Sequence, residues 1–307
     1  MAYDLIIIGA GPAGVSAAVY AARQKLNMLI ISKDVGGQVS KKAVDIENYP
    51  GFDKISGPDL TKLFSEQLEK NEVQIALDEV LKIEKEGDKF IVLTSQSKKY
   101  EALAVIIATG ADPRPLEVPG EKEFIGKGVS YCSLCDGPVF RDKTVAVVGG
   151  GNSGFESALF LSNYVKKIYI LEFNDSPRAD SENQELIKKS GKAEIITSAK
   201  VLKIEGDSFV KSLTYQNLKT SKEEKLDVNG IFVEVGYSPS TAFAKELVDF
   251  TDKDEIMAQT ETFQTKTPGI FAVGDCNQGK YKQIVTAAGE GAKAALAAYE
   301  YIQKTKK

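Results

Sequence analysis

Short apolar runs alternate along this chain with longer segments in which apolar residues recur at helical spacing. The first run, residues 4–8, is rich in β-branched residues and is typical of a buried parallel strand. A glycine-rich turn, an Ala-rich segment from Val15 to about Gln24 and a second apolar run over residues 28–32 follow. This order predicts strand, turn, helix and strand, which is the βαβ unit that opens a dinucleotide-binding fold.

The same pattern returns 140 positions later. Residues 144–148 form an apolar run, residues 149–154 a second glycine-rich turn, and a helical pattern to about Tyr164 leads into a predicted strand over residues 167–171. The repetition indicates two nucleotide sites in one chain. Two bound dinucleotides can pass electrons from one to the other.

Other segments complete the prediction of an α/β protein with two doubly wound, three-layer, Rossmann-like domains. Residues 73–107 and 267–275 are expected to contribute strands, and residues 287–303 a terminal helix followed by a solvated tail at 304–307. Proline-containing stretches at 112–120 and 236–240 are candidate linkers. An amphipathic helix is expected over residues 57–71, with Ser56 as N-cap and four core-facing side chains, Leu60, Leu63, Phe64 and Leu68.

Composition narrows the function classes. The 307 residues are 43% hydrophobic and 27% charged, as in ordinary globular proteins, and the formal net charge of −4 argues against a nucleic-acid binder. No apolar run reaches the roughly 18 residues that a membrane helix needs. The chain enters its first strand directly after Asp4, so we expect no signal peptide, no membrane association and a cytoplasmic location.

Histidine is absent, which excludes a Ser-His-Asp triad, an imidazole base and a His-ligated metal site. Cysteine occurs only at positions 132, 135 and 276, too few for an all-cysteine zinc site or a secreted disulfide scaffold. We therefore expect no metal, and we interpret Cys132 and Cys135 as a redox pair. Cys276 is expected to be a packed free thiol.

Both glycine-rich turns have the G-x-G-x-x-G spacing, and each lies between an apolar strand and a helix. In this setting the backbone N–H groups at the helix N-terminus can bind a pyrophosphate. A tight turn without a ligand is the alternative. The predicted contacts are Gly9, Gly11, Pro12, Ala13 and Gly14 in the first turn, and Gly149, Gly151, Asn152, Ser153 and Gly154 in the second.

Glu172 ends the strand of the second unit, 23 positions after Gly149. A carboxylate there can accept hydrogen bonds from both ribose hydroxyls of NAD, and it repels the 2′-phosphate of NADP. Only Arg178 lies nearby as a positive charge, so NADH is favoured over NADPH, although a solvated strand-end acid is the alternative. In the first unit the strand ends in Ser32 without an acid, and either Asp34 or the loop 36–38 could contact the ribose.

The cysteines occur in the run Tyr131-Cys132-Ser133-Leu134-Cys135-Asp136-Gly137-Pro138. Two thiols at C-x-x-C spacing can reach disulfide geometry within one helical turn, and the thiolate is the reactive form. Asp136 could pass a proton to the leaving thiol, or it could have a local role in a turn or cap. A buried pair without chemistry is the alternative for the cysteines.

With these motifs the chain resembles the low-molecular-weight thioredoxin reductases, of class II of the pyridine nucleotide-disulfide oxidoreductases, over essentially all 307 residues. Within that family it is most similar to the alkyl hydroperoxide reductase flavoproteins. The shared motifs, in family order, are the two glycine-rich turns, Gly36-Gly37-Gln38, Glu47-Asn48-Tyr49-Pro50-Gly51, Ala108-Thr109-Gly110, Cys132-x-x-Cys135-Asp136-Gly137-Pro138, Gly274-Asp275 and Lys282-Gln283-Ile284.

The resemblance implies an FAD domain formed by residues 1–113 and 243–307 around an inserted NAD(H) domain of residues 117–241. It implies that Cys135 faces the flavin, that Cys132 exchanges with a protein disulfide, that the NAD(H) domain swivels on its linkers, and that the protein is a homodimer. The FAD contacts it implies, besides the first glycine-rich turn, are Gly37, Gln38, Asn48, Thr109, Asp275, Gln283 and Ile284.

Two departures from the family refine the prediction. NADPH-dependent members of the family have a motif similar to His-Arg-Arg-x-x-x-Arg at the second ribose site. In this chain Glu172, Phe173 and Asn174 replace the first three motif residues, and Arg178 matches the last. The hydroperoxide reductase branch usually carries an N-terminal thioredoxin-like domain, and this chain starts directly at the FAD strand. We therefore expect an NADH-dependent enzyme that reduces a separate thioredoxin- or glutaredoxin-like protein and so feeds a peroxiredoxin.

Two other functions remain open from the sequence. A ferredoxin-driven flavin disulfide reductase would keep the fold with a vestigial nicotinamide site. A dinucleotide-binding sensor without turnover would bind the nucleotides but have no need for a C-x-x-C pair.

Overall fold

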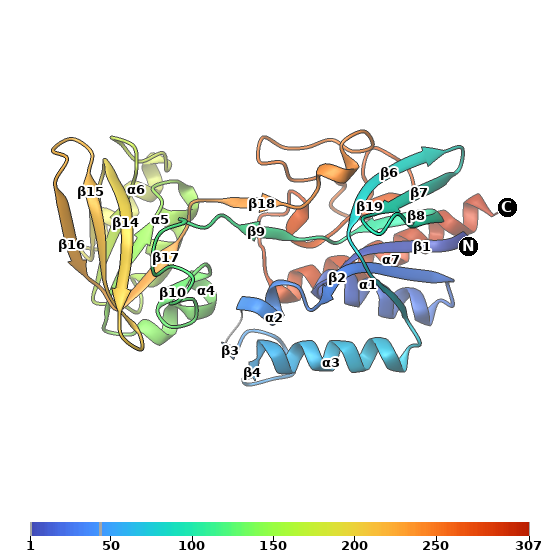
Figure 1. Cartoon of the computed structure of the whole chain (residues 1–307), viewed down its shortest axis with the longest axis horizontal. Helices are drawn as coiled ribbons and strands as arrows, with labels where there is room; N and C mark the ends of the chain where they lie inside the picture. The colour runs from blue at the N-terminus through green and yellow to red at the C-terminus, as the bar shows by residue number, and fades with distance from the viewer. Residues whose placement is uncertain (1, 43–44, 307) are drawn as a thin grey trace. The chain divides into compact units, whose positions relative to one another are not determined.

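The computed structural model describes residues 2–42 and 45–306, and the chain divides into two compact units. Unit 1 comprises Met1–Asp112 and Ser238–Lys307, and unit 2 comprises Pro113–Tyr237, so unit 2 is an insertion in unit 1. Where the chain crosses between the units, β9 (Ala111–Pro113) and β18 (Tyr237–Pro239) pair as a two-stranded ribbon (Figure 1).

Unit 1 is built on a seven-stranded sheet (Figure 1). Five strands run parallel: β5 (Gln74–Leu77), β2 (Met28–Val35), β1 (Ala2–Ala10), β8 (Lys99–Ile107) and β19 (Ile270–Ala272). Two antiparallel strands, β7 (Lys89–Thr94) and β6 (Val80–Glu86), continue the sheet beyond β8. The apolar run of β1 lies at the centre of this sheet, with both faces covered.

Three layers make up unit 1, because successive side chains of β1 point to opposite faces. Leu5 and Ile7 pack with the helices α1 (Pro12–Arg23), α3 (Gly57–Lys70) and α7 (Ile284–Thr305). Ile6 and Ile8 pack on the other face with β6, β7 and the segment 244–256. The shorter elements are α2 (Gln38–Lys42), β3 (Asp45–Ile46), β4 (Ile55–Ser56) and 3₁₀ turns at Ala242–Ala244 and Gly274–Cys276.

Unit 2 repeats the three-layer plan around a parallel sheet. One face carries α5 (Asn152–Leu161) and α6 (Ser181–Lys189), and the other an antiparallel sheet of β14 (Ala199–Gly206), β15 (Val210–Asn217) and β16 (Glu223–Asp227). The helix α4 (Ser133–Asp136) follows β10. In sheet order, the parallel strands are β10 (Val129–Ser130), β17 (Gly230–Val233), β11 (Thr144–Val148), β12 (Lys167–Leu171) and β13 (Ala193–Ile196).

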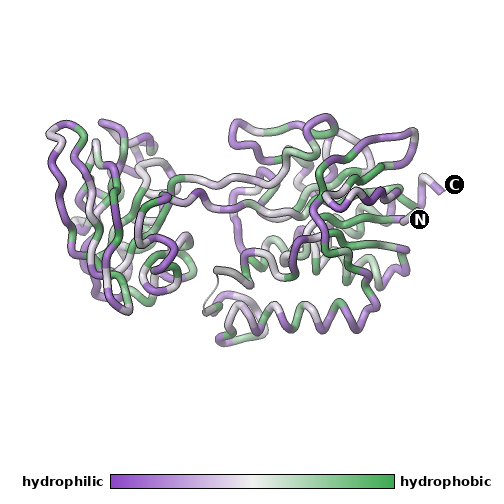
Figure 2. The backbone as a smooth tube through the Cα atoms, viewed as in Figure 1, coloured by the Kyte–Doolittle hydropathy of each residue, from purple (hydrophilic) through white to green (hydrophobic). Residues whose placement is uncertain are grey.

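Figure 2 shows hydrophobic stretches along the central strands of each unit and hydrophilic stretches in the peripheral loops. The predicted α/β class, with two Rossmann-like three-layer domains, is confirmed. Within residues 2–42 and 45–306, no helix combines the length and the apolar character that a bilayer crossing requires.

Several element boundaries differ from the sequence prediction for local reasons. The first helix begins at Pro12 rather than Val15, because proline has no N–H group to lose at the first position of a helix. The last helix begins at Ile284, where Gln283 and Thr286 form a capping box, and it extends to Thr305. Residues 304–305 therefore belong to the helix and not to a tail, although Lys304 is exposed as expected. Lys306 forms an ion pair with Asp4, and residue 307 lies outside the described residues.

The helix over residues 57–70 is as expected at its start and differs on one face. Ser56 is its N-cap, and the Ser56 hydroxyl oxygen accepts a hydrogen bond from the backbone N–H of Asp59. Leu60, Phe64 and Leu68 are buried as predicted. Leu63 is 40% exposed, so its assignment to the core-facing side was wrong.

Candidate active site

The carboxyl ends of the parallel strands in unit 1 bring the predicted FAD residues to one edge of the sheet. Ile8 of β1 pairs with Ile107 of β8, which pairs in turn with Ala272 of β19. The glycine-rich turn, Thr109 and Asp275 follow these three strand ends, at the edge where open α/β sheets bind ligands.

The glycine-rich turns of the two units share one backbone geometry. Gly9 and Gly149 have φ angles of 104° and 126°, which favour glycine. A Cβ atom on Gly14 would lie 1.9 Å from the carbonyl oxygen of Gly9, and one on Gly154 would lie 1.9 Å from that of Gly149. Each helix thus packs against its turn more closely than any side chain allows.

The middle glycine of each turn has a different role, because it leaves space in front of the helix. Gly11 and Gly151 are the N-caps of α1 and α5, in extended conformation, and neither helix start is capped by a side chain. A Cβ on either residue would meet no protein atom within 4 Å. Open space therefore lies before two uncapped helix N-termini, which is the arrangement that fits the pyrophosphate of a dinucleotide.

Further predicted FAD residues cluster around the start of α1. Gly37 has φ 55°, and a Cβ there would lie 3.6 Å from Cα of Gly11. A Cβ on Gly274 would lie 3.2 Å from that of Ala13, so the Gly274-Asp275 segment packs on the same helix start. These contacts gather several predicted FAD residues around one helix start within unit 1.

Three predicted flavin-side residues form contacts with other parts of unit 1. The Asn48 amide donates a hydrogen bond of 3.2 Å to Oε1 of Gln283, which precedes Ile284 at the start of α7. The Gln38 side chain donates to the backbone oxygen of Ala111 and to Oδ1 of Asp112. The structure thus brings together residues separated by up to 235 positions in the sequence.

Asp275 lies in an environment that disfavours its charge. Burial raises the pKa of its carboxyl group to about 6, with Glu290 adding to the rise and Lys282 opposing it. Glu290 holds the turn itself, because its carboxylate accepts a hydrogen bond of 2.7 Å from the backbone N–H of Gly274. A partly buried carboxyl group of this kind suits a ligand hydroxyl group as partner.

In unit 2 the strand register places the nucleotide turn and the cysteine pair at one edge. Val148, which precedes the turn, pairs with Leu171 before Glu172 and with Val233 before Glu234. On the far side of β17, Ser130 pairs with Phe232, and Cys132 follows two residues later. The short helix α4 that carries the cysteine pair, called the redox helix below, and the second glycine-rich turn therefore lie at the same carboxyl edge of the sheet.

Glu172 is buried and holds the glycine-rich loop. Its Oε2 atom accepts a hydrogen bond of 2.7 Å from the N–H of Gly150, and its Oε1 atom accepts bonds from the backbone and the side chain of Asn174. A carboxylate has about four acceptor positions, so three are used within the chain. The predicted contact with both ribose hydroxyls therefore requires Asn174 to release Oε1.

The other predicted NADH residues lie around the same loop. Arg178 is exposed, and its guanidinium group donates a bond of 3.3 Å to Oδ1 of Asn174. Asn152 and Asp180 exchange two hydrogen bonds of 2.8 and 2.9 Å. Ser153 is exposed in the first turn of α5.

Cys132 and Cys135 form a disulfide bond across α4, with their Cα atoms 5.3 Å apart. Cys132 is the N-cap of this short helix, and the backbone N–H of Cys135 donates to its sulfur. Within unit 2, Cys135 is exposed and Cys132 is partly buried. The predicted redox pair is thus joined and accessible.

The nearest carboxyl group in the sequence, Asp136, is held by a residue that the sequence analysis missed. The Ser130 hydroxyl donates a hydrogen bond of 2.5 Å to Oδ2 of Asp136 and accepts one of 3.0 Å from the N–H of Cys132. Ser130 is buried at the end of β10. It ties the predicted proton donor to the backbone of the first cysteine.

Comparison with known proteins agrees with this arrangement. The family model described as pyridine nucleotide-disulphide oxidoreductase matches residues 3–291. The chain belongs to this family. Membership implies FAD and a nicotinamide cofactor, and the open helix N-termini of both units fit such nucleotides.

One group of relatives consists of alkyl hydroperoxide reductases. The F subunit of this enzyme is 38% identical in Staphylococcus epidermidis and in Pseudomonas putida, over 98% and 99% of this chain. The chain spans 59% of the length of these relatives.

Solved structures of thioredoxin reductases match over nearly the whole chain. The enzyme from Streptococcus pyogenes has a TM-score of 0.93 at 42% identity, covering 99% of both chains. That from Giardia duodenalis has a TM-score of 0.93 at 33% identity, covering 98% of this chain and 99% of its own. The family resemblance inferred from the motifs is therefore confirmed.

Beyond the family motifs, the structure reveals polar residues that the sequence analysis did not single out. Glu121 is buried and accepts hydrogen bonds from the backbone N–H groups of Leu116 and Glu117 and from the hydroxyl of Tyr131. This network joins the start of unit 2 to the residue before Cys132. No signal in the sequence distinguished Glu121, because Glu117, Lys122 and Glu123 are charged residues of the same segment.

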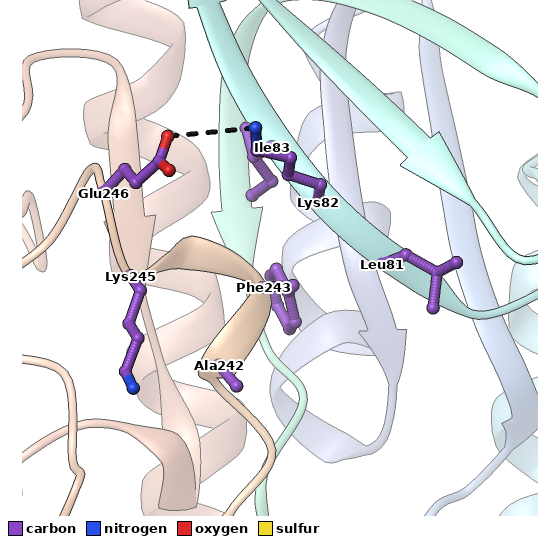
Figure 3. A pocket seen from close by; sticks show the side chains of 7 residues that line it. All are labelled: Leu81, Lys82, Ile83, Ala242, Phe243, Lys245 and Glu246. Atoms are coloured by element: carbon purple, nitrogen blue, oxygen red, sulfur yellow. Dashed lines mark ion pairs between the residues drawn. The ribbon is translucent and has the colours of Figure 1, made fainter.

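Two other features lie outside the predicted site. Cys276 is fully buried, and burial raises the pKa of its thiol to about 11, which suits a packed rather than a reactive cysteine. A small surface pocket of unit 1 contains none of the predicted site residues and is bordered by the Lys82–Glu246 ion pair; Figure 3 shows its lining residues from β6 and the segment 242–246. Within the described part of the chain, no cluster of three or more potential ligands could hold a metal ion.

Proposed function

We propose that this protein is an FAD-dependent disulfide reductase that takes electrons from NADH and delivers them, through the Cys132–Cys135 disulfide, to a separate thioredoxin- or glutaredoxin-like protein. The observation that carries the proposal is the disulfide on α4, located at the same sheet edge as an uncapped, glycine-rich helix start. When bound, FAD supplies the two-electron chemistry that connects a nicotinamide hydride to a disulfide.

The nucleotides are assigned to the units by the residues around each turn. Asp275, Gln38, Asn48 and Gln283 support FAD in unit 1. The Glu172 carboxylate supports a nicotinamide nucleotide in unit 2 and favours NADH, because a 2′-phosphate would approach a buried acid and residues 173–180 contain one basic residue, Arg178.

The chemistry of the chain is thiol–disulfide exchange. In the reduced protein the thiolate of Cys132 attacks one sulfur of the partner disulfide, forms a mixed disulfide and releases the other sulfur as a thiolate. The thiolate of Cys135 then attacks the Cys132 sulfur, restores the intramolecular disulfide and releases the reduced partner. Asp136, held by Ser130, supplies the proton for a leaving thiolate, since the chain has no histidine.

The dimer, the cytoplasmic location and the delivery of electrons to a peroxiredoxin are part of the proposal. The names of the relatives support only the electron delivery, as thioredoxin reductases and the F subunits of alkyl hydroperoxide reductases are similar to this chain over nearly its whole length.

The test is an anaerobic titration of the purified yellow protein with NADH and, separately, with NADPH. We expect NADH to bleach the flavin absorbance at a lower concentration than NADPH, and an oxidised thioredoxin-like protein then to restore the colour and yield two thiols per disulfide. Bleaching by neither nucleotide would refute the nicotinamide route and favour a ferredoxin-type donor. Bleaching without thiol release would refute disulfide reduction.

A further inference from the structure

A chain of hydrogen bonds connects the redox helix to the end of strand β17. The hydroxyl of Ser133, the residue after Cys132, donates a bond of 2.9 Å to Oγ of Ser157 on α5. The Ser157 hydroxyl in turn donates a bond of 2.6 Å to Oε1 of Glu234. Three elements of unit 2 are thus joined by side chains, behind the exposed face of α4.

The two serines are placed where apolar residues would be expected. Ser133 and Ser157 are buried, and Ser157 shares the inner face of α5 with Ala158 and Leu161. A hydroxyl group in this position is costly unless it is hydrogen-bonded, and a serine within a helix contributes little to helix stability. Core packing does not explain why Ser133 and Ser157 are serines, whereas the hydrogen bond from Ser157 to Glu234 does.

Glu234 is positioned by the nucleotide-binding edge. Glu234 follows Val233 at the carboxyl end of β17, and its backbone N–H donates to the carbonyl oxygen of Val148. A Cβ on Gly149 would lie 2.2 Å from the carbonyl oxygen of Glu234. Its backbone therefore touches the second glycine-rich turn, and its side chain extends to α5.

The groups around the Glu234 carboxyl favour a change of charge near neutral pH. Burial raises its pKa to about 7, Glu156 on α5 adds to the rise, and the bond from Ser157 opposes it. On α4 the charged residue is Asp136, which Ser130 holds, while the side chain that β11 contributes to the α5 face of the sheet is the apolar Val147.

We propose that Glu234 is a positioning residue for the redox pair: through Ser157 and Ser133 it orients α4, and its charge sets the reactivity of the Cys132 and Cys135 thiols. The inference rests on the proposed function, in which these thiols are the reduced state of the enzyme.

The charge of Glu234 can change thiol reactivity because it sets the direction of the Ser133–Ser157 and Ser157–Glu234 hydrogen bonds. With Glu234 ionised, both hydroxyls must donate toward it, so Ser133 has no proton to donate within α4. With Glu234 protonated, the carboxyl group can donate to Ser157 and Ser157 to Ser133, which frees the Ser133 hydroxyl to donate to a thiolate. Loss of the negative charge also favours a thiolate on Coulombic grounds.

The test measures thiol reactivity in the reduced, full-length protein with its flavin, without nicotinamide nucleotide or a protein partner. The rate of alkylation by iodoacetamide is followed from pH 5 to 10, and mass spectrometry assigns the label to Cys132 or Cys135. Wild-type protein should show a second inflection near pH 7 below the main thiol transition. Glu234→Gln, which keeps the shape and an acceptor for Ser157, should lose this inflection and react about threefold faster at pH 8.

Two further variants separate charge from contact. Ser157→Ala keeps the Glu234 charge and breaks the chain, so its lower inflection should shrink. Glu156→Gln removes a neighbouring charge and leaves the Ser133–Ser157–Glu234 hydrogen bonds intact. It should therefore retain the lower inflection, shifted to a lower pH than in wild type. A Glu234→Gln profile that superimposes on wild type would overturn the proposal, even if Ser157→Ala failed to fold. Because alkylation needs no electron donor, this result is independent of whether NADH reduces the flavin.

Discussion

Ser32 and Glu172 occupy equivalent positions in the two βαβ units, and each accepts a hydrogen bond from the residue after the first glycine of its turn. The Ser32 hydroxyl accepts from Ala10 N–H at 3.1 Å, and the Glu172 carboxylate accepts from Gly150 N–H at 2.7 Å. A neutral group therefore performs in unit 1 the loop-holding role that a charged group performs in unit 2. Glu172 additionally carries a negative charge, and its Oε1 atom becomes available to a ligand once Asn174 releases it.

The first prediction uses this equivalence. Glu172→Ser should keep the loop in place, because a hydroxyl holds it in unit 1, while the charge that we propose contacts the ribose is lost. We expect NADH to bind about tenfold more weakly, corresponding to ~1.4 kcal/mol, and the preference for NADH over NADPH to shrink. Equilibrium titration with both nucleotides measures this. The exposed Asp175→Ser provides a matched control on the same loop, and an unchanged preference in Glu172→Ser would exclude Glu172 as the discriminating residue.

A second prediction separates the two nucleotide sites. Gly11→Ala and Gly151→Ala place a methyl group in open space before α1 and α5, so both variants should fold with wild-type stability. Gly11→Ala should lose bound flavin, measured by absorbance of the purified protein, whereas Gly151→Ala should keep the flavin and lose nucleotide reduction of it. The opposite pattern would reverse the assignment of cofactors to units. Gly154→Ala, with its Cβ 1.9 Å from a carbonyl oxygen, should instead destabilise the fold.

The sequence predicted most of this architecture because strand, turn and helix signals are local. The two apolar strands, their glycine-rich turns and the N-cap at Ser56 depend on residues within a few positions of each other. The disulfide was also predictable, since its two cysteines are three positions apart. Leu63 was misassigned because helical spacing cannot tell the core-facing side of a helix from its flank.

The polar contacts of the site were beyond such reasoning. Ser157 and Glu234 are 77 positions apart, and Ser133 and Ser157 are 24 apart, so the packing of α4, α5 and β17 in the folded unit brings them together. Glu234 did have a local signal, an acid at the carboxyl end of an apolar run, as Glu172 has. Glu172 was identifiable from its position 23 residues after Gly149, whereas no glycine-rich turn precedes Glu234 at that spacing, so Glu234 could not be distinguished from a solvated strand end.

The third prediction concerns the order of the cysteines. Cys135→Ser should leave NADH reduction of the flavin intact, abolish turnover and trap a covalent adduct between Cys132 and a thioredoxin-like partner. Cys132→Ser should also abolish turnover, and it should trap no adduct if Cys132 is the exchanging thiol. Non-reducing electrophoresis detects the adduct. Cys135 is the more exposed residue of the pair, and an adduct formed only by Cys132→Ser would reverse the assigned roles.

The fourth prediction addresses proton delivery. Asp136→Asn removes the acid but keeps an acceptor for Ser130, and we expect turnover to fall by about 10²-fold, in the range for loss of a general acid. Ser130→Ala keeps the acid and removes its 2.5 Å hydrogen bond, so the loss should be smaller. Steady-state thiol release from an oxidised partner measures both variants. Equal losses in both would indicate that Asp136 acts through its contact with Ser130 and not as an acid.

The last prediction follows from the raised pKa of Glu234. Its carboxyl group has an ordinary pKa of 4.5 and a pKa of about 7 in the folded protein, so between these values the folded state binds more protons than the unfolded state. Stability must therefore fall as pH rises through this window, and the loss persists above pH 7. At ~1.4 kcal/mol per pKa unit, reduced for partial exposure, the loss is roughly 2 kcal/mol.

Glu234→Gln removes this loss because its amide does not titrate. Relative to wild type, the variant should therefore gain stability between pH 5 and pH 8, seen as a larger difference in thermal midpoint at pH 8. Glu156→Gln, on the neighbouring helix, should show a much smaller gain, since it acts on Glu234 only through its charge. If the thermal midpoints of wild type and Glu234→Gln differed by the same amount at pH 5 and at pH 8, Glu234 would not titrate between these pH values.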